Sequence, residues 1–238
     1  MEARPGARNG CTVVLKPAEQ TPLSALRLAE LMIDARLPNG VVNVITGFGE
    51  TAGAALAGHP DVDKVAFTGS TEVGKLIVKA AANDLKRVTI ELGGKSPNVV
   101  FADADLETAI PGAANAIFFN HGQCCAAGSR LYVEQKVYDE VLAGVSDYAD
   151  KIKVGRGLDP DTEMGPLVSV EQLERVTGFL EAGKREGVRT VTGGTQIGEH
   201  GYFVAPTVLE GRHGLGQHLQ HLPGGAPVWW PQAIRLGP

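Results

Sequence analysis

The sequence predicts an α/β fold in which helices cover the faces of a parallel β-sheet. Runs rich in β-branched residues alternate with helical runs over the first 92 residues, in the order β-α-β-α-β-α-β. Proline and glycine stand where many of these runs end. With 43% hydrophobic and 21% charged residues, the 238-residue chain has the composition of a globular protein with one large or two modest domains.

The first strand is expected at residues 11–17, where a β-branched run ends at a proline. Residues 21–40 then predict a helix with Thr21 as its N-cap, Pro22 in its first turn and Pro-Asn-Gly as its stop. The remaining elements of this half are a strand at 41–46, a short helix at 50–58, a strand at 64–68, a helix at 70–83 and a strand at 87–92. This order predicts parallel strands, and the ligands of such sheets bind at the carboxyl ends of the strands.

Beyond residue 94 the alternation continues less regularly, and a domain boundary is expected there. The predicted elements are a strand at 98–102, a helix from a cap at Asp103 or Asp105 toward residue 120, a strand at 130–134 and amphipathic helices at 136–153 and 169–187. Pro111 falls past the first turn of the helix after Asp105 and is expected to kink it. The sequence therefore predicts domains at residues 1–93 and 94–209.

The last segment, residues 210–238, differs in kind from the rest of the chain. After Glu210 there is no acid and no lysine, while both tryptophans and three of the six histidines gather among glycines and prolines. We expect this tail to be irregular. Its histidines, His213, His218 and His221, have no carboxylate or thiol nearby in sequence and are not expected to bind metal.

Composition also narrows the partners. A net charge of −5 and the lack of Lys/Arg clusters argue against nucleic acid and an anionic membrane surface, which leaves a small molecule. No apolar run has the form of a secretory signal or the length of a membrane span. The odd number of cysteines, three, does not suit a disulfide framework, so we expect free thiols in the cytoplasm.

Two of the three cysteines, Cys124 and Cys125, lie side by side in the run FFNHGQCCAAGS. Side chains this small contribute little packing energy, so the run favours a reachable thiolate that backbone amides support. The same pattern also allows burial as a small hydrophobic residue. A zinc site is not expected, because neither C-x-x-C spacing nor paired histidines accompany the two thiols.

Two glycine turns allow either phosphate binding or a purely structural role. In the pattern Gly69-x4-Gly74-Lys75 a strand turns into a helix, whose first backbone amides could hold a phosphate. A nucleoside-triphosphate P-loop is disfavoured, because Leu76 stands where Ser or Thr should contact magnesium. The second turn, residues 47–53, resembles a dinucleotide fingerprint with an extra residue between its later glycines, which favours a structural role.

Glu91 stands at the end of a mainly apolar strand, before a Gly-Gly turn. An acid at this position lies on the rim where ligands of a parallel sheet bind. Partial burial there would raise its pKa toward that of a working general base. A solvated or capping glutamate is the structural alternative.

Four motifs stand in order, LKPAEQTP, FTGSTEVG, ELGGKSPN and NHGQCCAAGSR, and are followed by MGPLVS and GYFVAPTVL. Together they resemble the NAD(P)-dependent aldehyde dehydrogenase superfamily, from about Gly10 to Leu209. The resemblance implies part of a Rossmann-type NAD-binding domain followed by part of an α/β catalytic domain. It also implies an oxidoreductase that converts an aldehyde to a carboxylic acid with NAD, and homo-oligomers in the full-length family.

The resemblance also assigns roles to residues. The family's nucleophile stands two residues after the Gln of the GQ pair, which makes it Cys125 here and leaves Cys124 a packing role. The glutamate of the ELGGK motif, which activates the deacylating water, is Glu91. Four residues match the positions that bind the cofactor, the first two at the adenosine ribose and the others beside the pyrophosphate: Lys16, Glu19, Gly69 and Ser70.

Parts of the family pattern are not found in the chain. They are the half that precedes residue 11, which includes an asparagine that helps stabilise the oxyanion, the later E-x-F-G-P motif, and the last strands that build the oligomer. Two hypotheses follow. The chain is a dehydrogenase by descent and site chemistry, or it is a catalytically inactive fragment that survives as an interaction remnant or pseudogene product. Hydride transfer with NAD discriminates between them.

Overall fold

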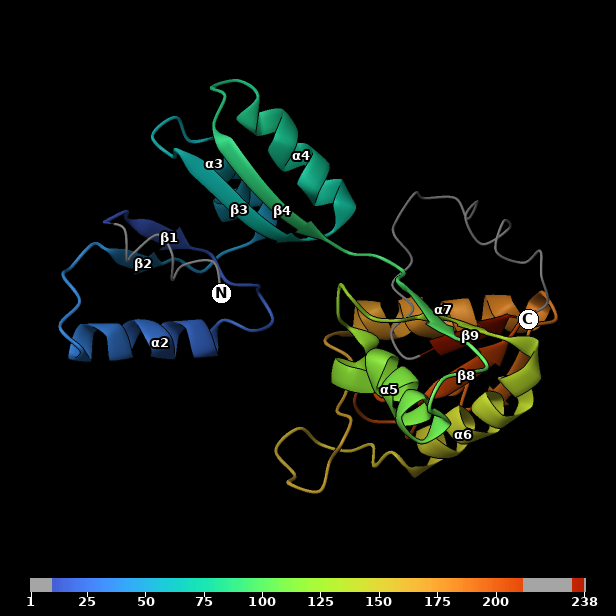
Figure 1. Cartoon of the computed structure of the whole chain (residues 1–238). Helices are drawn as coiled ribbons and strands as arrows, with labels where there is room; N and C mark the ends of the chain where they lie inside the picture. Colours follow the sequence, from blue (N-terminus) through green and yellow to red (C-terminus); the bar gives the residue numbers. More distant parts are fainter. Residues whose placement is uncertain (1–9, 212–232, 238) are drawn as a thin grey trace. The chain divides into compact units, whose positions relative to one another are not determined.

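The computed structural model of the chain describes residues 10–211 and 233–237. The chain forms two compact units, Met1–Leu92 and Gly93–Pro238, and each unit has its own strands and helices (Figure 1). Within the residues that the structure describes, no helix is long and apolar enough to cross a membrane. The predicted α/β fold class is confirmed.

The first unit contains two pairs of parallel strands. Strand β1 (Val13–Leu15) pairs with β2 (Val42–Val44), and β3 (Lys64–Gly69) pairs with β4 (Arg87–Leu92). The chain between them forms the helices α2 (Leu23–Asp34), α3 (Ala54–Gly58) and α4 (Thr71–Ala81) and the π-helical turn η1 (Gly49–Gly53). The expected alternation of strands and helices and the parallel pairing are therefore confirmed, but the four strands form two separate pairs and not one continuous sheet.

Helix α4 lies close against strand β4 because of one glycine. Ser70 is its N-cap, and the hydroxyl oxygen accepts a hydrogen bond from the Val73 amide at 3.3 Å. On the inner face, a Cβ at Gly74 would stand 2.8 Å from Cδ2 of Leu92. Gly74 thus has a packing role, as in the structural interpretation of this glycine turn.

Helix α2 begins later than the sequence predicts. Pro22 occupies the N-cap, the helix starts at Leu23, and no side chain caps it. The expectation that Thr21 is the cap is therefore wrong. A cap at Thr21 would place Pro22 at the first helical position, N1. In the structure Pro22 is the N-cap, and Leu23 is the first helical residue.

The first unit buries few apolar side chains. Among its described residues, the buried hydrophobic ones are Ala57, Ile77 and Ala81. Large apolar side chains remain exposed on its helices and loops, namely Leu23, Ile33, Phe48, Leu76 and Leu85. Hydrophobic burial therefore contributes little to the stability of this unit.

The second unit is built on a five-stranded sheet with the order β5-β6-β9-β8-β7. Its strands are β5 (Pro97–Val100), β6 (Arg130–Val133), β7 (Arg189–Thr192), β8 (Thr207–Glu210) and β9 (Ala233–Gly237). All neighbouring strands are parallel except β7, which is antiparallel to β8. The sheet carries the helices α5 (Leu106–Phe118), α6 (Tyr138–Lys151) and α7 (Val170–Arg185).

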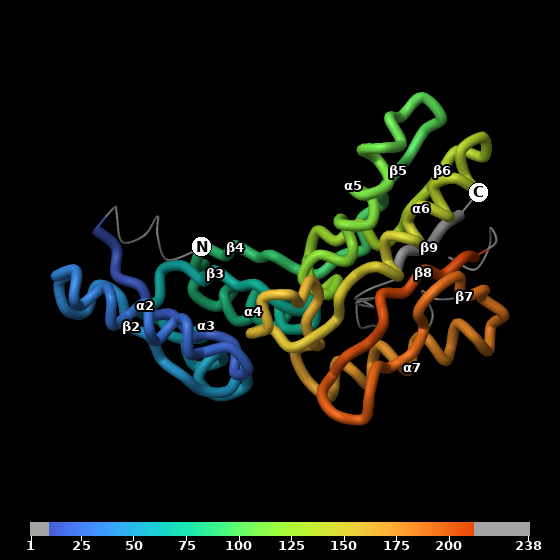
Figure 2. The backbone as a smooth tube through the Cα atoms, turned by 90° about the horizontal axis from the view of Figure 1, so that it is seen from below, coloured from blue at the N-terminus to red at the C-terminus, as the bar shows by residue number. Residues whose placement is uncertain are grey.

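Helices cover both faces of this sheet and form two cores. Helices α5 and α6 pack on one face, in a cluster centred on the buried residues Ile117, Leu131, Val141, Val145 and Val208. Helix α7 lies along β7 and β8 (Figure 2), and its cluster contains Val176, Leu180 and Leu209. Because adjacent strand residues point to opposite faces, Val208 and Leu209 place the two clusters on opposite sides of β8.

One expectation for this half is confirmed and one needs correction. Asp105, one of the two expected caps, is the N-cap of helix α5 (Leu106–Phe118), and Pro111 lies inside that helix. In the tail, residues 233–237 form strand β9 and are not irregular, because an extended segment satisfies its backbone groups by pairing with β6 and β8 at once. Residues 212–232, with the three tail histidines, lie outside the described residues.

Candidate active site

The two adjacent cysteines lie in the second unit, in the loop that connects α5 to β6. Cys125 is exposed, whereas Cys124 is half-buried and packs against the core beneath α5 and α6. The loop folds back on the end of α5, because the Gly128 amide donates to the Ala116 carbonyl at 2.9 Å. The structure therefore separates the two thiols that the sequence could not tell apart without the resemblance.

A left-handed turn precedes the cysteines. Asn120 and His121 have φ angles of 49° and 58°, and Gly122 follows with φ at 67°. The Gln123 amide donates to the Asn120 carbonyl at 2.9 Å, and the Asn120 side-chain amide donates back to the Gln123 carbonyl at 3.0 Å. The turn thus enters the thiol loop with a fixed backbone direction.

The ELGGK motif contributes a second segment beside the thiol loop. A Cβ at Gly94 would stand 3.5 Å from the Cys125 carbonyl oxygen. The next residue, Lys95, accepts a hydrogen bond at its carbonyl from Nε of Arg130 at 2.9 Å. Burial, and secondarily the charge of Arg130, lower the pKa of the Lys95 amine to about 7. Lys95 is the lysine of the ELGGK motif, and the sequence pattern alone does not indicate its burial.

Glu91 lies in the first unit, next to the last residue of β4, and is paired in register with Thr68 of β3. Its side chain is exposed, so the partial burial considered for it is not seen. The position at the carboxyl end of a parallel strand agrees with the rim where ligands of such sheets bind. Glu91 and Cys125 belong to different units.

Lys16 and Glu19 form an ion pair in the first unit. The Lys16 ammonium lies 3.1 Å from Oε1 of Glu19 and also donates to the carbonyl oxygens of Pro17 at 2.8 Å and Gly47 at 3.0 Å. Hydrogen bonds from the backbone amide of Glu19 itself and from Lys16 lower the pKa of the Glu19 carboxyl. This carboxylate is therefore charged at neutral pH and can accept hydrogen bonds.

The glycine turn at residues 47–53 packs beside this ion pair. A Cβ at Gly53 would stand 3.5 Å from Cε of Lys16, and one at Gly49 would stand 3.8 Å from Oε1 of Glu19. Sequence reasoning favoured a structural role for this turn. In the structure the turn packs against the Lys16 and Glu19 pair, and its glycines leave room for these two side chains.

Gly69 and Ser70 stand where β3 turns into α4. A Cβ at Gly69 would stand 2.4 Å from Cζ of Phe67, so any larger residue at this position would displace the Phe67 ring. Ser70 caps the helix by accepting from the Val73 amide, and the earlier amides of the first turn have no carbonyl partner within the helix. Such an N-terminus is suited to an anion.

Among the described residues, no group of three or more metal-ligating side chains comes together.

The fold and the candidate site together define a class of protein. It is a two-unit α/β protein with an exposed cysteine thiol in one unit and a lysine–glutamate pair beside a glycine turn in the other. The chain belongs to the aldehyde dehydrogenase family, whose sequence profile matches residues 2–214. The family resemblance inferred from the motifs is thus confirmed.

Similar proteins are longer than this chain. DhaS of Bacillus subtilis is 59% identical over 200 residues, which make up 84% of this chain and 40% of DhaS. Aldehyde dehydrogenase 1A1 of Equus caballus is 54% identical over 206 residues, which make up 86% of this chain and 41% of that protein. The solved NAD+ complex of an aldehyde dehydrogenase from Bacillus cereus matches with a TM-score of 0.88 and 48% identity, over 99% of this chain and 47% of that one. The chain therefore spans less than half the length of these relatives.

Proposed function

We propose that the chain carries the chemistry of an NAD-dependent oxidoreductase that converts an aldehyde to a carboxylic acid through a thioester on Cys125. The observation that carries the proposal is the contrast between the adjacent thiols, since Cys125 is exposed and Cys124 packs against the core. A nucleophile must be able to reach its substrate. Membership of the aldehyde dehydrogenase family supports the reaction class.

In this mechanism Cys125 reacts as a thiolate. Its sulfur forms a bond to the carbonyl carbon of the aldehyde, and the carbonyl electron pair moves onto the oxygen. When bound, NAD supplies the acceptor for the hydride that leaves this carbon. The oxygen electron pair then re-forms the carbonyl, and the acyl group remains on Cys125 as a thioester.

Glu91 is proposed as the general base of the second half-reaction. Its carboxylate takes a proton from water while the water oxygen attacks the thioester carbon. The C–S bond breaks, the thiolate of Cys125 is restored, and the carboxylic acid leaves. An exposed carboxylate at the end of β4 has the access to water that this role requires.

The first unit offers residues that fit NAD. The Glu19 carboxylate can accept hydrogen bonds from ribose hydroxyls, and Lys16 lies within 3.1 Å of it to hold it in place. The glycine turn at 47–53 presents no side chain at the two positions that face this pair. At the start of α4, Gly69 and Ser70 stand beside free backbone amides that suit a pyrophosphate. The cofactor proposed is therefore NAD.

The partner proposed is a small-molecule aldehyde. All three cysteines of the chain are free thiols, which supports a reducing compartment such as the cytoplasm. A homo-oligomer belongs to this proposal only for the full-length family. The competing hypothesis, an inactive remnant, is favoured by the many exposed apolar side chains of the first unit.

The test is a covalent one. Purified chain is mixed with NAD and a short aldehyde, quenched in acid within one turnover, and digested for mass spectrometry. We expect an acyl group on Cys125 that needs both NAD and aldehyde and is absent from Cys125→Ala. The Cys124→Ala variant is the matched control and should keep the adduct. An adduct on Cys124, or none at any time point, would refute the proposed role of Cys125.

A further inference from the structure

The turn before the thiols has an unusual backbone conformation. Two consecutive non-glycine residues, Asn120 and His121, adopt left-handed backbone angles. Such angles are rare for residues other than glycine and persist only where surrounding contacts hold them. Asparagine and histidine are among the side chains that tolerate this region best. The contacts that hold this turn in place therefore indicate its structural role.

Gln123 connects this turn to a distant segment of the same unit. Its Oε1 accepts a hydrogen bond from the Val168 amide at 3.2 Å, which joins the thiol loop to the chain just before α7. A backbone N–H can only donate, so the atom that faces it must be the oxygen of the Gln123 amide. This contact fixes the orientation of the Gln123 side-chain amide, whose NH2 group points away from Val168.

The NH2 group of Gln123 faces the ring of His121. The distance from Nε2 of Gln123 to Nδ1 of His121 is 3.3 Å. In the tautomer that lets the NH2 group donate to this atom, Nδ1 is the acceptor and carries no proton. The ring is then neutral with its proton on Nε2, which lies against Gly165, where a Cβ would stand 3.0 Å from that nitrogen. The neutral form of His121 and the Gln123 contact to Val168 therefore depend on one another.

The surroundings of His121 also favour its neutral form. Burial lowers the pKa of His121 below its ordinary value, opposed only by a hydrogen bond with the backbone of Asn120. The packed segment 164–168 carries no titratable side chain, and the thiol loop contributes only Cys124 and Cys125. The next charged residue, Glu163, accepts a hydrogen bond from the Lys153 amide, and no charged side chain adds to the causes of the shift.

We propose that Gln123 positions the Cys125 loop by clamping it to the Val168 amide, and that neutral His121 orients the Gln123 side chain for this clamp. The inference rests on the proposed role of Cys125 for its functional meaning. Protonation of His121 puts a hydrogen on Nδ1, so that two donors face each other. The Gln123 amide must then turn, which presents NH2 to the Val168 N–H, or move away. In both cases the clamp is lost.

Two variants of the full chain test the pairing. His121→Asn keeps an acceptor oxygen at the position of Nδ1, suits the left-handed backbone and does not titrate. Gln123→Glu still accepts from Val168, but its second oxygen favours a proton on Nδ1. The ring signals of His121 are followed by NMR against pH, with His59 and His200 as references. We expect His121 to titrate below pH 6.5 in the unmodified chain and above it in Gln123→Glu. Equal titration in both would overturn the proposal.

The clamp itself is measured by amide hydrogen exchange. In the unmodified chain, the Val168 amide should lose protection on the order of tenfold, the worth of one hydrogen bond, as His121 becomes protonated. The His121→Asn variant should keep this protection through the same pH range, and Gln123→Ala should lack it at every pH. A Val168 amide whose protection follows pH identically in the unmodified chain and in His121→Asn would refute the role of His121.

The functional meaning has its own measurement. The rate of iodoacetamide labelling at Cys125 relative to Cys11 should change with His121 protonation in the unmodified chain and not in His121→Asn. Cys11 is the reference because it is exposed and lies in the first unit. These measurements need neither NAD nor aldehyde, so a failed clamp and a failed dehydrogenase are distinguishable. A labelling ratio that is the same in Gln123→Ala as in the unmodified chain would show that the clamp does not position Cys125.

Discussion

Among single residues, Lys95 combines partial burial with a cationic neighbour, Arg130. Its amine has a pKa of about 7 in the folded protein and an ordinary value of 10.5. Between these two pH values the unfolded chain binds more protons than the folded one. The free energy of unfolding contributed by this group therefore rises as pH increases from about 7 to 10.5, and it is lowest below pH 7.

Replacing Lys95 should remove this dependence. We expect Lys95→Met to be more stable than the unmodified chain below pH 7, with a difference that disappears toward pH 10.5. Urea unfolding of both chains across this range measures it. Lys136→Met is the control, because the Lys136 side chain is 81% exposed and should show no such trend. If the Lys95→Met difference stays constant with pH, the lowered pKa of Lys95 is wrong.

Glu19 should decide which cofactor the first unit binds. Its carboxylate accepts hydrogen bonds from ribose hydroxyls and would repel a 2′-phosphate at the same place. We therefore expect the chain to prefer NAD over NADP, and Glu19→Gln to reduce this preference on the order of tenfold. Calorimetric titration with both cofactors measures the ratio of affinities.

The matched control for Glu19 is Glu30→Gln. Glu30 is an exposed carboxylate of the same unit and is paired with Arg27 on α2. Its replacement by Gln removes one negative charge at a position outside the predicted ribose site. Its variant should keep the NAD preference. Equal affinity of the unmodified chain for both cofactors would count against the role of Glu19.

At the scale of elements, the contact between α4 and β4 depends on Gly74. A Cβ there would stand 2.8 Å from a methyl carbon of Leu92, so that side chain must move. We expect Gly74→Ala to lower the free energy of unfolding by about 1–3 kcal/mol, the usual cost of overpacking. Thermal unfolding monitored by circular dichroism measures it.

Gly58→Ala serves as the control for this element. Gly58 lies at the end of α3 in the same unit, and a Cβ there would meet nothing within 4 Å. Its replacement should be neutral or slightly stabilising, because alanine is the better helix former. A Gly74→Ala variant as stable as Gly58→Ala would show that α4 and β4 are not closely packed.

Long periodic elements could be predicted from the sequence, whereas contacts between distant segments could not. Helices α4, α5, α6 and α7 follow hydrophobic periodicity, and all of them except α6 begin at a side-chain cap, such as Asp105 at α5. Strand β9 carries no such signal, because an extended segment of five residues is defined by the partners on either side of it.

The same limit applies to the candidate site. The motifs identify Cys125, Glu91 and the cofactor residues through resemblance. They do not show that Cys124 packs against the core or that the turn at 47–53 lies beside the Lys16 and Glu19 pair. Both facts depend on which segments meet in three dimensions, and local sequence does not encode such meetings.

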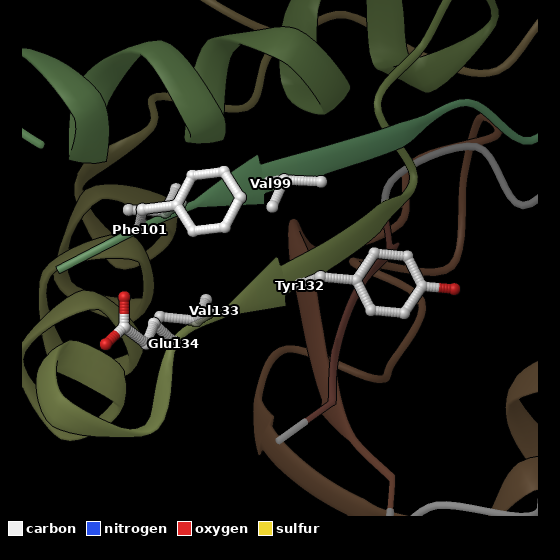
Figure 3. Close-up of a pocket in the computed structure, with 6 residues that line it drawn as sticks. Val99, Phe101, Tyr132, Val133 and Glu134 are labelled. Atoms are coloured by element: carbon white, nitrogen blue, oxygen red, sulfur yellow. The ribbon is translucent and has the colours of Figure 1, made fainter.

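At the scale of the whole molecule, the two units differ in how they are held together. The second unit has two buried clusters on opposite faces of its sheet. It still exposes an apolar hollow over β5 and β6, where Figure 3 shows Val99, Phe101 and Tyr132 with Glu134. Over residues 10–92 the first unit buries three hydrophobic side chains and leaves Leu85 88% and Leu23 78% exposed. Local opening is therefore easier in the first unit.

This difference predicts that cofactor-dependent and thiol-dependent chemistry separate. The proposed NAD site lies in the weakly packed first unit, and hydride transfer needs a precisely held ring. Thiol attack on an activated ester needs only Cys125 and the well-packed second unit. We expect the chain to show weak esterase activity and thiol labelling, with little continuous NADH formation from short aldehydes after the first acyl group forms. In rising urea, any NADH formation should vanish before the esterase does. Both should be absent in Cys125→Ala. Strong NADH formation that survives to the same urea concentration as the esterase would contradict this account, and it would show that the first unit is as stable as the second.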